Sequence, residues 1–372
     1  MNNLHNYNLA LFFTRGLSLK KWDKLGMLNR EIRTYQELSK SFNNVYFFTY
    51  GSDDRSYVSI LPKNIVIVEK PSWIPSNMYS ILLPFIHYKK FKKIHIIKTN
   101  QMDGSWAAVI AKKMFGIKLV IRCGYEWFSF IEKGNRAFWK KVFAKFAEKI
   151  SYTNANKIII TSDDDKDFII KRFNIPHSKI EVIPNYIDTQ KFSPLLVEKE
   201  SDRILFLGRF EDQKNLFNLV RAMAGIQARL VMIGNGSQKD QLIKLAQENN
   251  VQLVFLGNIS QDAIPKELCR SRIFILPSLY EGNPKALLEA MSCGLPCIGA
   301  RSPGIQNIIK DGENGVLCGV DAPSIHESIK KVLNNQELSN HIGKGARDTI
   351  VSTFSLEKVL EKEINLHSSL VS

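Results

Sequence analysis

Short apolar or β-branched runs alternate with helix-patterned segments along the whole chain. The first half contains runs at 9–14, 45–50, 65–69, 94–99, 118–122, 157–162 and 179–183. The second half contains runs at 204–208, 229–234, 252–257, 273–277 and 296–300. Between the first two runs, apolar side chains recur every three or four positions, at Leu25, Leu28, Ile32, Tyr35 and Leu38. Strands that alternate with helices predict an α/β fold with parallel sheets covered on both faces, arranged here as two Rossmann-like lobes.

A chain of 372 residues is too long for one ordinary core, and 44% hydrophobic residues supply enough apolar material for two. The chain turns polar and irregular near 190–200, which places the boundary between residues 1–190 and 191–355, and 356–372 has the pattern of a terminal helix. No apolar run approaches the ~18–20 residues that span a bilayer. The N-terminal apolar stretch at 9–13 is too short for a signal peptide and no basic segment precedes it, so we expect a cytoplasmic protein.

The positive charge is confined to one half of the chain. Residues 1–190 hold 30 Lys and Arg against 16 Asp and Glu, a net charge of +14, whereas residues 191–372 hold 21 against 20, a net of +1. Such asymmetry favours an anionic partner, and lipid headgroups or phosphorylated acceptors fit it as well as nucleic acid does. Overall solubility would explain the net charge but not its confinement. The five cysteines form no disulfide or zinc pattern and are expected to be buried thiols.

The most informative segment is 276–300, where two carboxylates, Glu281 and Glu289, stand eight positions apart around a helix start. Asn283 is a suitable N-cap and Pro284 suits the first helical position. Gly294 is expected to end the helix in a left-handed conformation. The backbone N–H groups at a helix start attract an anion, so the segment suits a phosphorylated, hydroxyl-rich ligand such as a sugar nucleotide.

A second candidate site follows the strand that ends at Gly208. Arg209 and Lys214 lie in the loop after this strand, where open parallel sheets bind their ligands. Two cations spaced along a loop can hold the two charged groups of a diphosphate. The glycines beginning at Gly234 lack the third glycine of a dinucleotide motif, and we expect a tight turn packed near the donor pocket.

The segment with Glu281 and Glu289 resembles the E-x7-E signature of retaining glycosyltransferases of family 4, which have the GT-B fold. ILFLGRFEDQKN (204–215), VIPNYID (182–188), VMIGNGS (231–237) and DGENGVLC (311–318) also match that family in kind and order. The resemblance implies two Rossmann-like lobes with parallel sheets facing across a cleft: an acceptor lobe at 1–190, a nucleotide-sugar lobe at 191–355, and a helix at 356–372 that crosses back to the first lobe.

The resemblance also implies a role for each site residue. Glu281 would contact the donor sugar, and Glu289 would accept hydrogen bonds from the nucleotide ribose. Arg209 and Lys214 would stabilise the leaving nucleoside diphosphate. The further donor-binding positions are Gly16, Gly208, Gly234, Asn283, Pro284 and Lys285, of which Lys285 either adds charge or faces solvent.

The first half offers weaker candidates. Residues 15–26 are expected to form a long loop in which Gly16 lets the backbone approach a ligand. Many relatives carry a His in the loop at 122–127, and this chain has none there. If a side-chain base is needed, Asp103 or Glu126 must supply it, and we prefer Asp103, although simple loop capping explains Asp103 equally well.

Two further patterns each have a functional and a structural interpretation. The acidic run at 163–165 follows a strand and begins a helix, so we interpret it as helix capping rather than a metal site, and we expect no metal or other cofactor. The helix at 136–150 has aromatic residues, including Phe146, on one side and lysines on the other. This pattern fits a membrane-surface helix or a core-packed helix with a basic outer face, and we favour core packing.

Taken together, these features predict a retaining, metal-independent glycosyltransferase of the cytoplasm, at the inner face of the membrane. It would move a sugar from a nucleotide diphosphate to a hydroxyl of a glycan or lipid-linked glycan, in surface polysaccharide or glycolipid biosynthesis. Residues 1–190 would contact anionic membrane, and no nucleic acid is expected. The alternatives are a sugar-nucleotide epimerase of the same fold and a basic, non-catalytic protein that binds glycans or nucleic acid.

Overall fold

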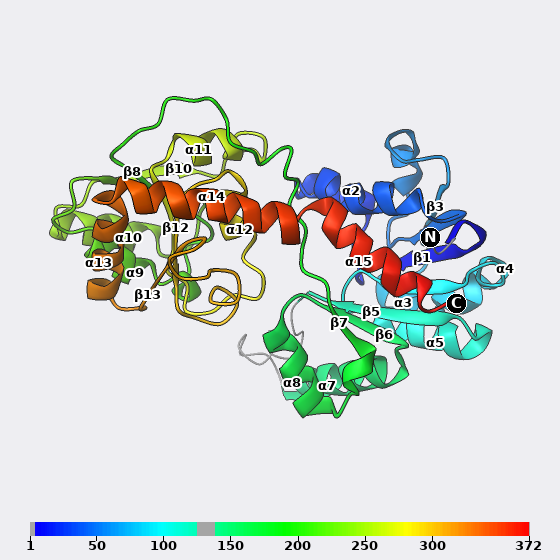
Figure 1. Cartoon of the computed structure of the whole chain (residues 1–372). Helices are drawn as coiled ribbons and strands as arrows, with labels where there is room; N and C mark the ends of the chain where they lie inside the picture. Colours follow the sequence, from blue (N-terminus) through cyan, green and yellow to red (C-terminus); the bar gives the residue numbers. More distant parts are fainter. Residues whose placement is uncertain (1–3, 125–137, 372) are drawn as a thin grey trace. The chain divides into compact units, whose positions relative to one another are not determined.

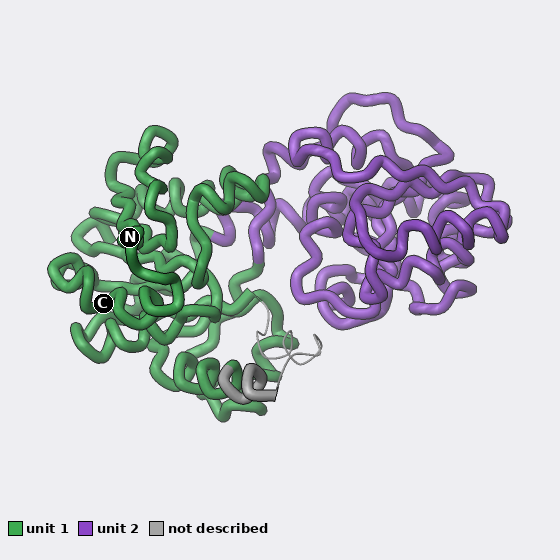
Figure 2. Tube along the Cα trace, turned by 180° about the vertical axis from the view of Figure 1, so that it is seen from behind, with its two compact units in different colours: residues 1–184, 360–372 green, residues 185–359 purple. Residues whose placement is uncertain are grey.

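The computed structural model describes residues 4–124 and 138–371, with side chains from Ala144 onward in the second range. The chain forms two compact units (Figure 2). Unit 1 comprises Met1–Pro184 and Leu360–Ser372, and unit 2 comprises Asn185–Val359. In the described part of the chain, no helix combines the length and the apolar character needed to cross a membrane.

Unit 1 is built on a seven-stranded parallel sheet with the strand order β3-β2-β1-β4-β5-β6-β7 (Figure 1). The strands are β1 (Asn8–Phe12), β2 (Asn44–Phe48), β3 (Ile65–Val68), β4 (Ile96–Thr99), β5 (Lys118–Cys123), β6 (Lys157–Ile160) and β7 (Ile180–Val182). All seven fall within the ranges predicted from the sequence to within one residue. Their side chains are buried almost throughout, as expected for a parallel sheet covered on both faces.

The described helices of unit 1 are α1 (Leu19–Lys24), α2 (Leu28–Ser39), α3 (Ser76–Ile86), α4 (Tyr88–Phe91), α5 (Ser105–Phe115), α7 (Phe138–Asn154) and α8 (Asp163–Phe173). The expectation of a long loop at 15–26 is wrong, because α1 lies within it. Ser18 caps α1 by accepting from Lys21 N, and Trp22 stacks on Phe13 with ring centroids 4.3 Å apart. Leu25 follows α1 and is 59% exposed, so the buried face of α2 begins at Leu28.

Helix α7 packs differently from the sequence expectation. Phe146, assigned to the core side, is 63% exposed, while Ala144, Ala147 and Glu148 are buried. Small residues face the core here because α5 approaches closely: the hydroxyls of Ser105 and Ser151 lie 2.7 Å apart. The prediction of a core-packed aromatic face is therefore wrong at Phe146, and the aromatic residues at 138–143 lie outside the described side chains.

Unit 2 contains a six-stranded parallel sheet with the order β10-β9-β8-β11-β12-β13. Its strands are β8 (Arg203–Leu207), β9 (Arg229–Ile233), β10 (Leu253–Gly257), β11 (Ile273–Leu276), β12 (Cys297–Ala300) and β13 (Val316–Cys318). Its helices are α9 (Leu216–Ala222), α10 (Lys239–Glu248), α11 (Ile264–Arg270), α12 (Lys285–Ser292), α13 (Ala322–Leu333) and α14 (Gln336–Thr353). The sequence analysis missed β13, which is only three residues long.

The C-terminal helix α15 (Leu356–Ser368) is helical as expected, and its residues from Leu360 onward belong to unit 1. There Lys98 Nζ of β4 lies 2.5 Å from Glu363 Oε1, and His367 lies beside the same carboxylate at 3.4 Å. All three side chains are at most 1% exposed, and burial lowers the pKa of His367. The five cysteines are buried and unbridged, as expected.

Candidate functional site

Loops at the carboxyl ends of β8 and β9 lie back to back in unit 2. Gly208 N donates to Ile233 O and Phe210 N donates to Asn235 O, both at 3.0 Å. Gly234 has a φ of 132°, and a Cβ there would lie 1.9 Å from Gly208 O. Only glycine fits this approach, so the expected tight turn is present and it supports the loop that carries Arg209.

The next loop, which follows β11, is joined to the β8 loop by a buried ion pair. Lys214 Nζ lies 2.5 Å from Glu281 Oε1, with side chains 14% and 9% exposed. Beside this pair, Gln213 Nε2 donates to Tyr280 O at 2.8 Å and Leu279 N donates to Gln213 O at 2.9 Å. The structure therefore brings Lys214 and Glu281, 67 positions apart in the sequence, to the same point at the carboxyl edge of the sheet.

Glu281 is held from below by the loop after β12. Its backbone N–H donates to Pro303 O at 2.9 Å. Gly304 has a φ of 81°, and a Cβ there would lie 2.1 Å from Glu281 O. This close backbone contact fixes the position of the Glu281 loop against the loop after β12. Sequence reasoning did not identify Gly304, for which the only signal was one glycine in a polar turn.

Helix α12 begins one residue later than the sequence predicts. Pro284 is the N-cap, with φ −75° and ψ 90°, and its carbonyl accepts from Leu287 N at 3.0 Å. The prediction of Asn283 as N-cap and Pro284 as first helical residue is therefore wrong. Asn283 Oδ1 instead accepts from Asn185 Nδ2 at 3.4 Å, which draws the side chain away from the helix start. The helix ends as predicted, with Gly294 at a φ of 70°.

The remaining donor-site residues differ in exposure. Glu289 is 7% exposed, so it is not a surface acid. Lys285 is half-buried and Pro284 is buried. Arg209 has a side chain 67% exposed, and its Nη1 donates to Glu211 at 3.1 Å. An exposed guanidinium and a largely buried ammonium in the same loop are suitable cations for a ligand that enters from solvent.

Asn215 completes the loop and was missed by the sequence analysis. It adopts the left-handed conformation at φ 56°, and its side-chain amide donates to Val320 O at 2.7 Å and to Pro277 O at 3.2 Å. The asparagine ties the β8 loop to the segments after β11 and β13. Its signal was an Asn immediately before a helix, a position where a left-handed residue is common.

Chemically, this edge of the sheet joins two cations, an acid and the start of a helix. The cations and helical N–H groups suit phosphate oxygens, while Glu281 and Glu289 suit hydroxyl groups. In the described part of the chain, no cluster of three His, Cys, Asp or Glu side chains is arranged to hold a metal ion.

The candidate residues of unit 1 lie at the carboxyl ends of β1 and β4. Arg15 Nε and Nη2 reach the two carboxylate oxygens of Asp103 at 3.0 and 3.3 Å, and Arg15 stacks over Trp106 at 5.4 Å. Burial raises the pKa of Asp103, although Arg15 opposes the shift. Gly16 has a φ of 77° and open space where a Cβ would point. Glu126, the other candidate base, lies outside the described residues.

The acidic run at the start of α8 makes the expected capping contacts. Ser162 accepts from Asp165 N at 3.2 Å, and its hydroxyl donates to Asp165 Oδ2 at 2.7 Å. Asp163 and Asp164 complete an acidic first turn, which complements the helix dipole. These contacts account for the run as a helix start.

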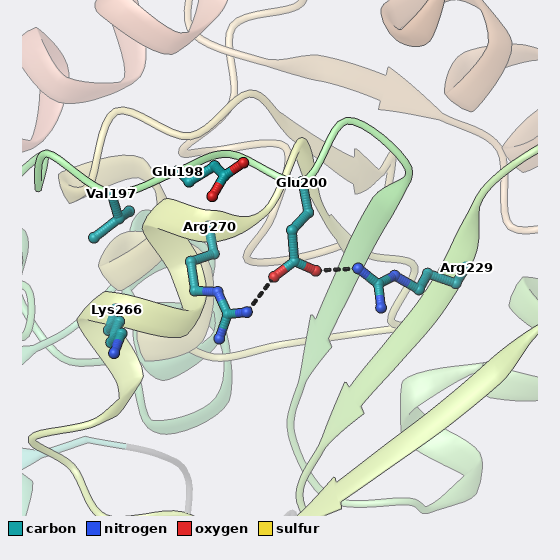
Figure 3. A pocket seen from close by; sticks show the side chains of 6 residues that line it. All are labelled: Val197, Glu198, Glu200, Arg229, Lys266 and Arg270. Atoms are coloured by element: carbon teal, nitrogen blue, oxygen red, sulfur yellow. Dashed lines mark hydrogen bonds and ion pairs between the residues drawn. The ribbon is translucent and has the colours of Figure 1, made fainter.

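A cavity of about 540 Å³ lies at the opposite edge of the unit 2 sheet, beside the amino ends of β8 and β9 (Figure 3). Glu200 points into it and pairs with Arg270 at 2.5 Å and with Arg229. Ligands of parallel α/β sheets bind at the carboxyl edge, and both arginines of this cavity already pair with Glu200. The cavity is therefore a poorer candidate site than the loop edge around Lys214.

Comparison with known proteins finds matches to two glycosyltransferase profiles. The profile of the group 1 glycosyl transferases matches residues 188–349, and that of glycosyltransferase family 4 matches residues 32–191. The UDP-Gal:alpha-D-GlcNAc-diphosphoundecaprenol alpha-1,3-galactosyltransferase of Escherichia coli is 28% identical, over 85% of this chain and 84% of that protein. The lipopolysaccharide core biosynthesis glycosyltransferase LpsE of Rhizobium meliloti (strain 1021) is 27% identical, over 51% of this chain and 58% of LpsE.

Among solved structures, HepE of Anabaena in complex with UDP superimposes with a TM-score of 0.76 over 98% of this chain and 100% of that chain, at 14% identity. A likeness at this identity concerns the fold alone, and it confirms the GT-B class with its two Rossmann-like units. The two profiles adjoin and together run from residue 32 to residue 349. The chain belongs to the group 1, family 4 glycosyltransferases.

Proposed function

We propose that this protein is a retaining glycosyltransferase that moves a sugar from a nucleotide diphosphate to a hydroxyl of a glycan or lipid-linked glycan during surface glycan biosynthesis. The observation that carries the proposal is the Lys214–Glu281 pair beside the start of α12. The activities of the two relatives support the acceptor class, since one acts on a diphosphoundecaprenol-linked sugar and the other in lipopolysaccharide core biosynthesis.

In this proposal, the donor diphosphate binds Lys214 and Arg209. Negative charge grows on the diphosphate as the bond to the sugar C1 breaks, so cations placed there lower the barrier. When a donor phosphate pairs with the Lys214 ammonium, the Glu281 carboxylate becomes available to accept a hydrogen bond from a hydroxyl of the donor sugar. Glu289, buried further along α12, accepts from the ribose hydroxyls.

Transfer with retention follows if the acceptor attacks from the face that the diphosphate leaves. The acceptor oxygen forms the new bond to C1, its proton passes to a donor phosphate oxygen, and the nucleoside diphosphate departs. Asp103 is the alternative proton acceptor. Because Arg15 engages both of its carboxylate oxygens, that role requires Arg15 to move, and we favour the phosphate.

We also propose that the enzyme works without a metal, in the cytoplasm, and that residues 1–190 contact anionic membrane. The net charge of +14 in residues 1–190 supports the membrane contact. A lipid-linked acceptor would be met at that membrane face.

A thermal-shift screen against a panel of sugar nucleotides tests the donor assignment, because a ligand that binds the folded state raises its stability by mass action. The donor that stabilises most is then offered with a lipid-linked acceptor, and the anomeric configuration of the product is read by nuclear magnetic resonance. An inverted product would overturn the retaining assignment. Interconversion of sugar nucleotides without acceptor would favour an epimerase, and salt-sensitive DNA binding without any donor shift would favour the non-catalytic alternative.

A further inference from the structure

Helix α3 carries an apolar stripe on its outer side. Met78, Ile81, Leu82, Phe85 and Ile86 are between 37% and 54% exposed. Their spacing of three, four, seven and eight positions from Met78 places them along one face of the helix. A solvent-facing helix side is normally polar, so five exposed apolar residues in this spacing need an explanation beyond folding.

The opposite side of α3 already supplies the packing that unit 1 requires. Tyr79 and Leu83 are at most 1% exposed, and Ser80 accepts from the Trp106 indole of α5 at 3.2 Å. The side of α3 that faces α5 is therefore buried, whereas the residues of the outer stripe stay 37–54% exposed. Figure 1 shows α3 beside α5.

Aromatic residues flank the stripe at both ends. Trp73, just before α3, is 81% exposed, and Tyr88, just after it, is 46% exposed. The ammonium of Lys70 donates to Pro71 O at 3.0 Å and to Ile74 O at 2.8 Å, which closes the turn around Trp73. Trp73 is thus held outward by an ordered turn. Trp and Tyr are the residues that favour the water–lipid interface.

Lysines gather after the stripe. Residues 86–97 contain four lysines and no Asp or Glu. Lys89, Lys92 and Lys93 are exposed directly after the helix, and Lys92 lies over the Tyr88 ring at 4.7 Å. On α5, exposed Lys113 and Met114 precede Phe115, whose ring lies 5.4 Å from that of Tyr88.

We propose that this α3 surface, formed by the stripe with Trp73, Tyr88 and the lysines after the helix, docks on a bilayer that contains anionic lipid. Apolar side chains flanked by interfacial aromatics and lysines match the lipid boundary and its headgroups. A second copy of the chain fits less well, because two such surfaces would bring their lysines together. The inference rests on the proposed membrane contact of residues 1–190 and is independent of the glycosyl-transfer chemistry.

Vesicle flotation with the full chain tests the surface, using phosphatidylcholine vesicles with and without phosphatidylglycerol. The wild type binds the anionic vesicles, and binding weakens as salt rises. Ile81→Ser with Phe85→Ser lowers the partition coefficient at least about tenfold. Lys89→Ala with Lys93→Ala lowers it about fivefold per lysine. Leu196→Ser and Lys266→Ala, which change an exposed apolar and an exposed basic residue of unit 2, leave it unchanged.

Trp73 supplies a direct reporter. Its fluorescence shifts to the blue on anionic vesicles, and Trp73→Phe reduces the shift, whereas buried Trp22 contributes none. Circular dichroism and binding of UDP confirm that each variant is folded and keeps its donor site. If the wild type does not bind anionic vesicles, both the α3 docking surface and the membrane contact of residues 1–190 are refuted. That conclusion holds even if the α3 surface proves to join two copies of the chain. If all variants bind like the wild type, only the assignment to α3 fails, and donor binding is unaffected by either outcome.

Discussion

Replacing Gly234 by alanine should disable the donor loop through backbone contact alone. The added Cβ would lie 1.9 Å from Gly208 O, whereas ordinary contact begins at 3.4 Å, so the β8 loop must retreat by about 1.5 Å. That movement breaks the bonds from Gly208 N to Ile233 O and from Phe210 N to Asn235 O. Arg209 lies in the sequence between Gly208 and Phe210, whose N–H groups make these bonds, so its proposed contact with the diphosphate moves with the loop.

The expected loss of stability follows from these terms. The two backbone hydrogen bonds contribute about 1 kcal/mol each, and a non-glycine residue at a φ of 132° adds about 1–3 kcal/mol of strain. Together they lower the free energy of unfolding of unit 2 by about 3–5 kcal/mol. Gly225→Ala is the matched control: its φ is 74°, but nothing lies within 4 Å of the new Cβ, so it costs about 1–2 kcal/mol.

Urea unfolding followed by circular dichroism measures both variants, because all five tryptophans lie before residue 140 and fluorescence does not report on unit 2. Calorimetric titration with UDP, without urea, then compares the affinities of the two variants for UDP. Equal destabilisation by Gly234→Ala and Gly225→Ala would refute the argument from close contact. So would a Gly234→Ala protein that is destabilised as expected but binds UDP as tightly as the control.

Three further outcomes follow from the structure. Glu281→Gln should lower kcat by about 10²–10³ while changing the free energy of unfolding by no more than about 1 kcal/mol, since Gln still accepts from Lys214; a wild-type rate would contradict the role. Burial lowers the pKa of His87 to about 4, so the unfolded chain takes up a proton first as the pH falls below about 6.5, and the free energy of unfolding declines from there to about pH 4. After discounting for partial exposure, the loss at pH 5 is about 1 kcal/mol. In urea titrations at several pH values, His87→Gln should flatten this decline. Activity should survive excess EDTA, and a loss that a divalent ion restores would reveal a metal site.

The parallel sheets were predictable because most of their strands are buried on both faces and appear as continuous apolar runs. Only β13 escaped, since Val316–Cys318 is too short for a periodic signal. Leu25 and Phe146 were assigned to buried helix faces, but both are exposed. Helical spacing identifies one face of a helix, but it does not say which neighbour covers that face or where the helix begins.

The residue types of the donor loops were predictable from the sequence, but the contacts between those residues were not. Glycines, cations and carboxylates after strands marked the carboxyl edge of the unit 2 sheet. The Lys214–Glu281 pair spans 67 positions, and the contact of Gly304 with Glu281 depends on how two loops stack, so neither follows from local sequence. Asn283 was expected to cap α12, but its side chain bonds to Asn185, 98 positions away. Long-range contacts of this kind override local propensity.

The measurement that tests the central claim most directly is calorimetric titration of nucleoside diphosphates into the wild type, Arg209→Ala, Lys214→Ala and the control Lys266→Ala, which removes an exposed lysine at the opposite edge of the unit 2 sheet. We predict that the wild type and Lys266→Ala bind alike, and that each loop variant binds at least about tenfold more weakly, since each loses a charge-assisted contact of about 1.5–3 kcal/mol. Unchanged affinity in both loop variants, or no binding by the wild type, would contradict it.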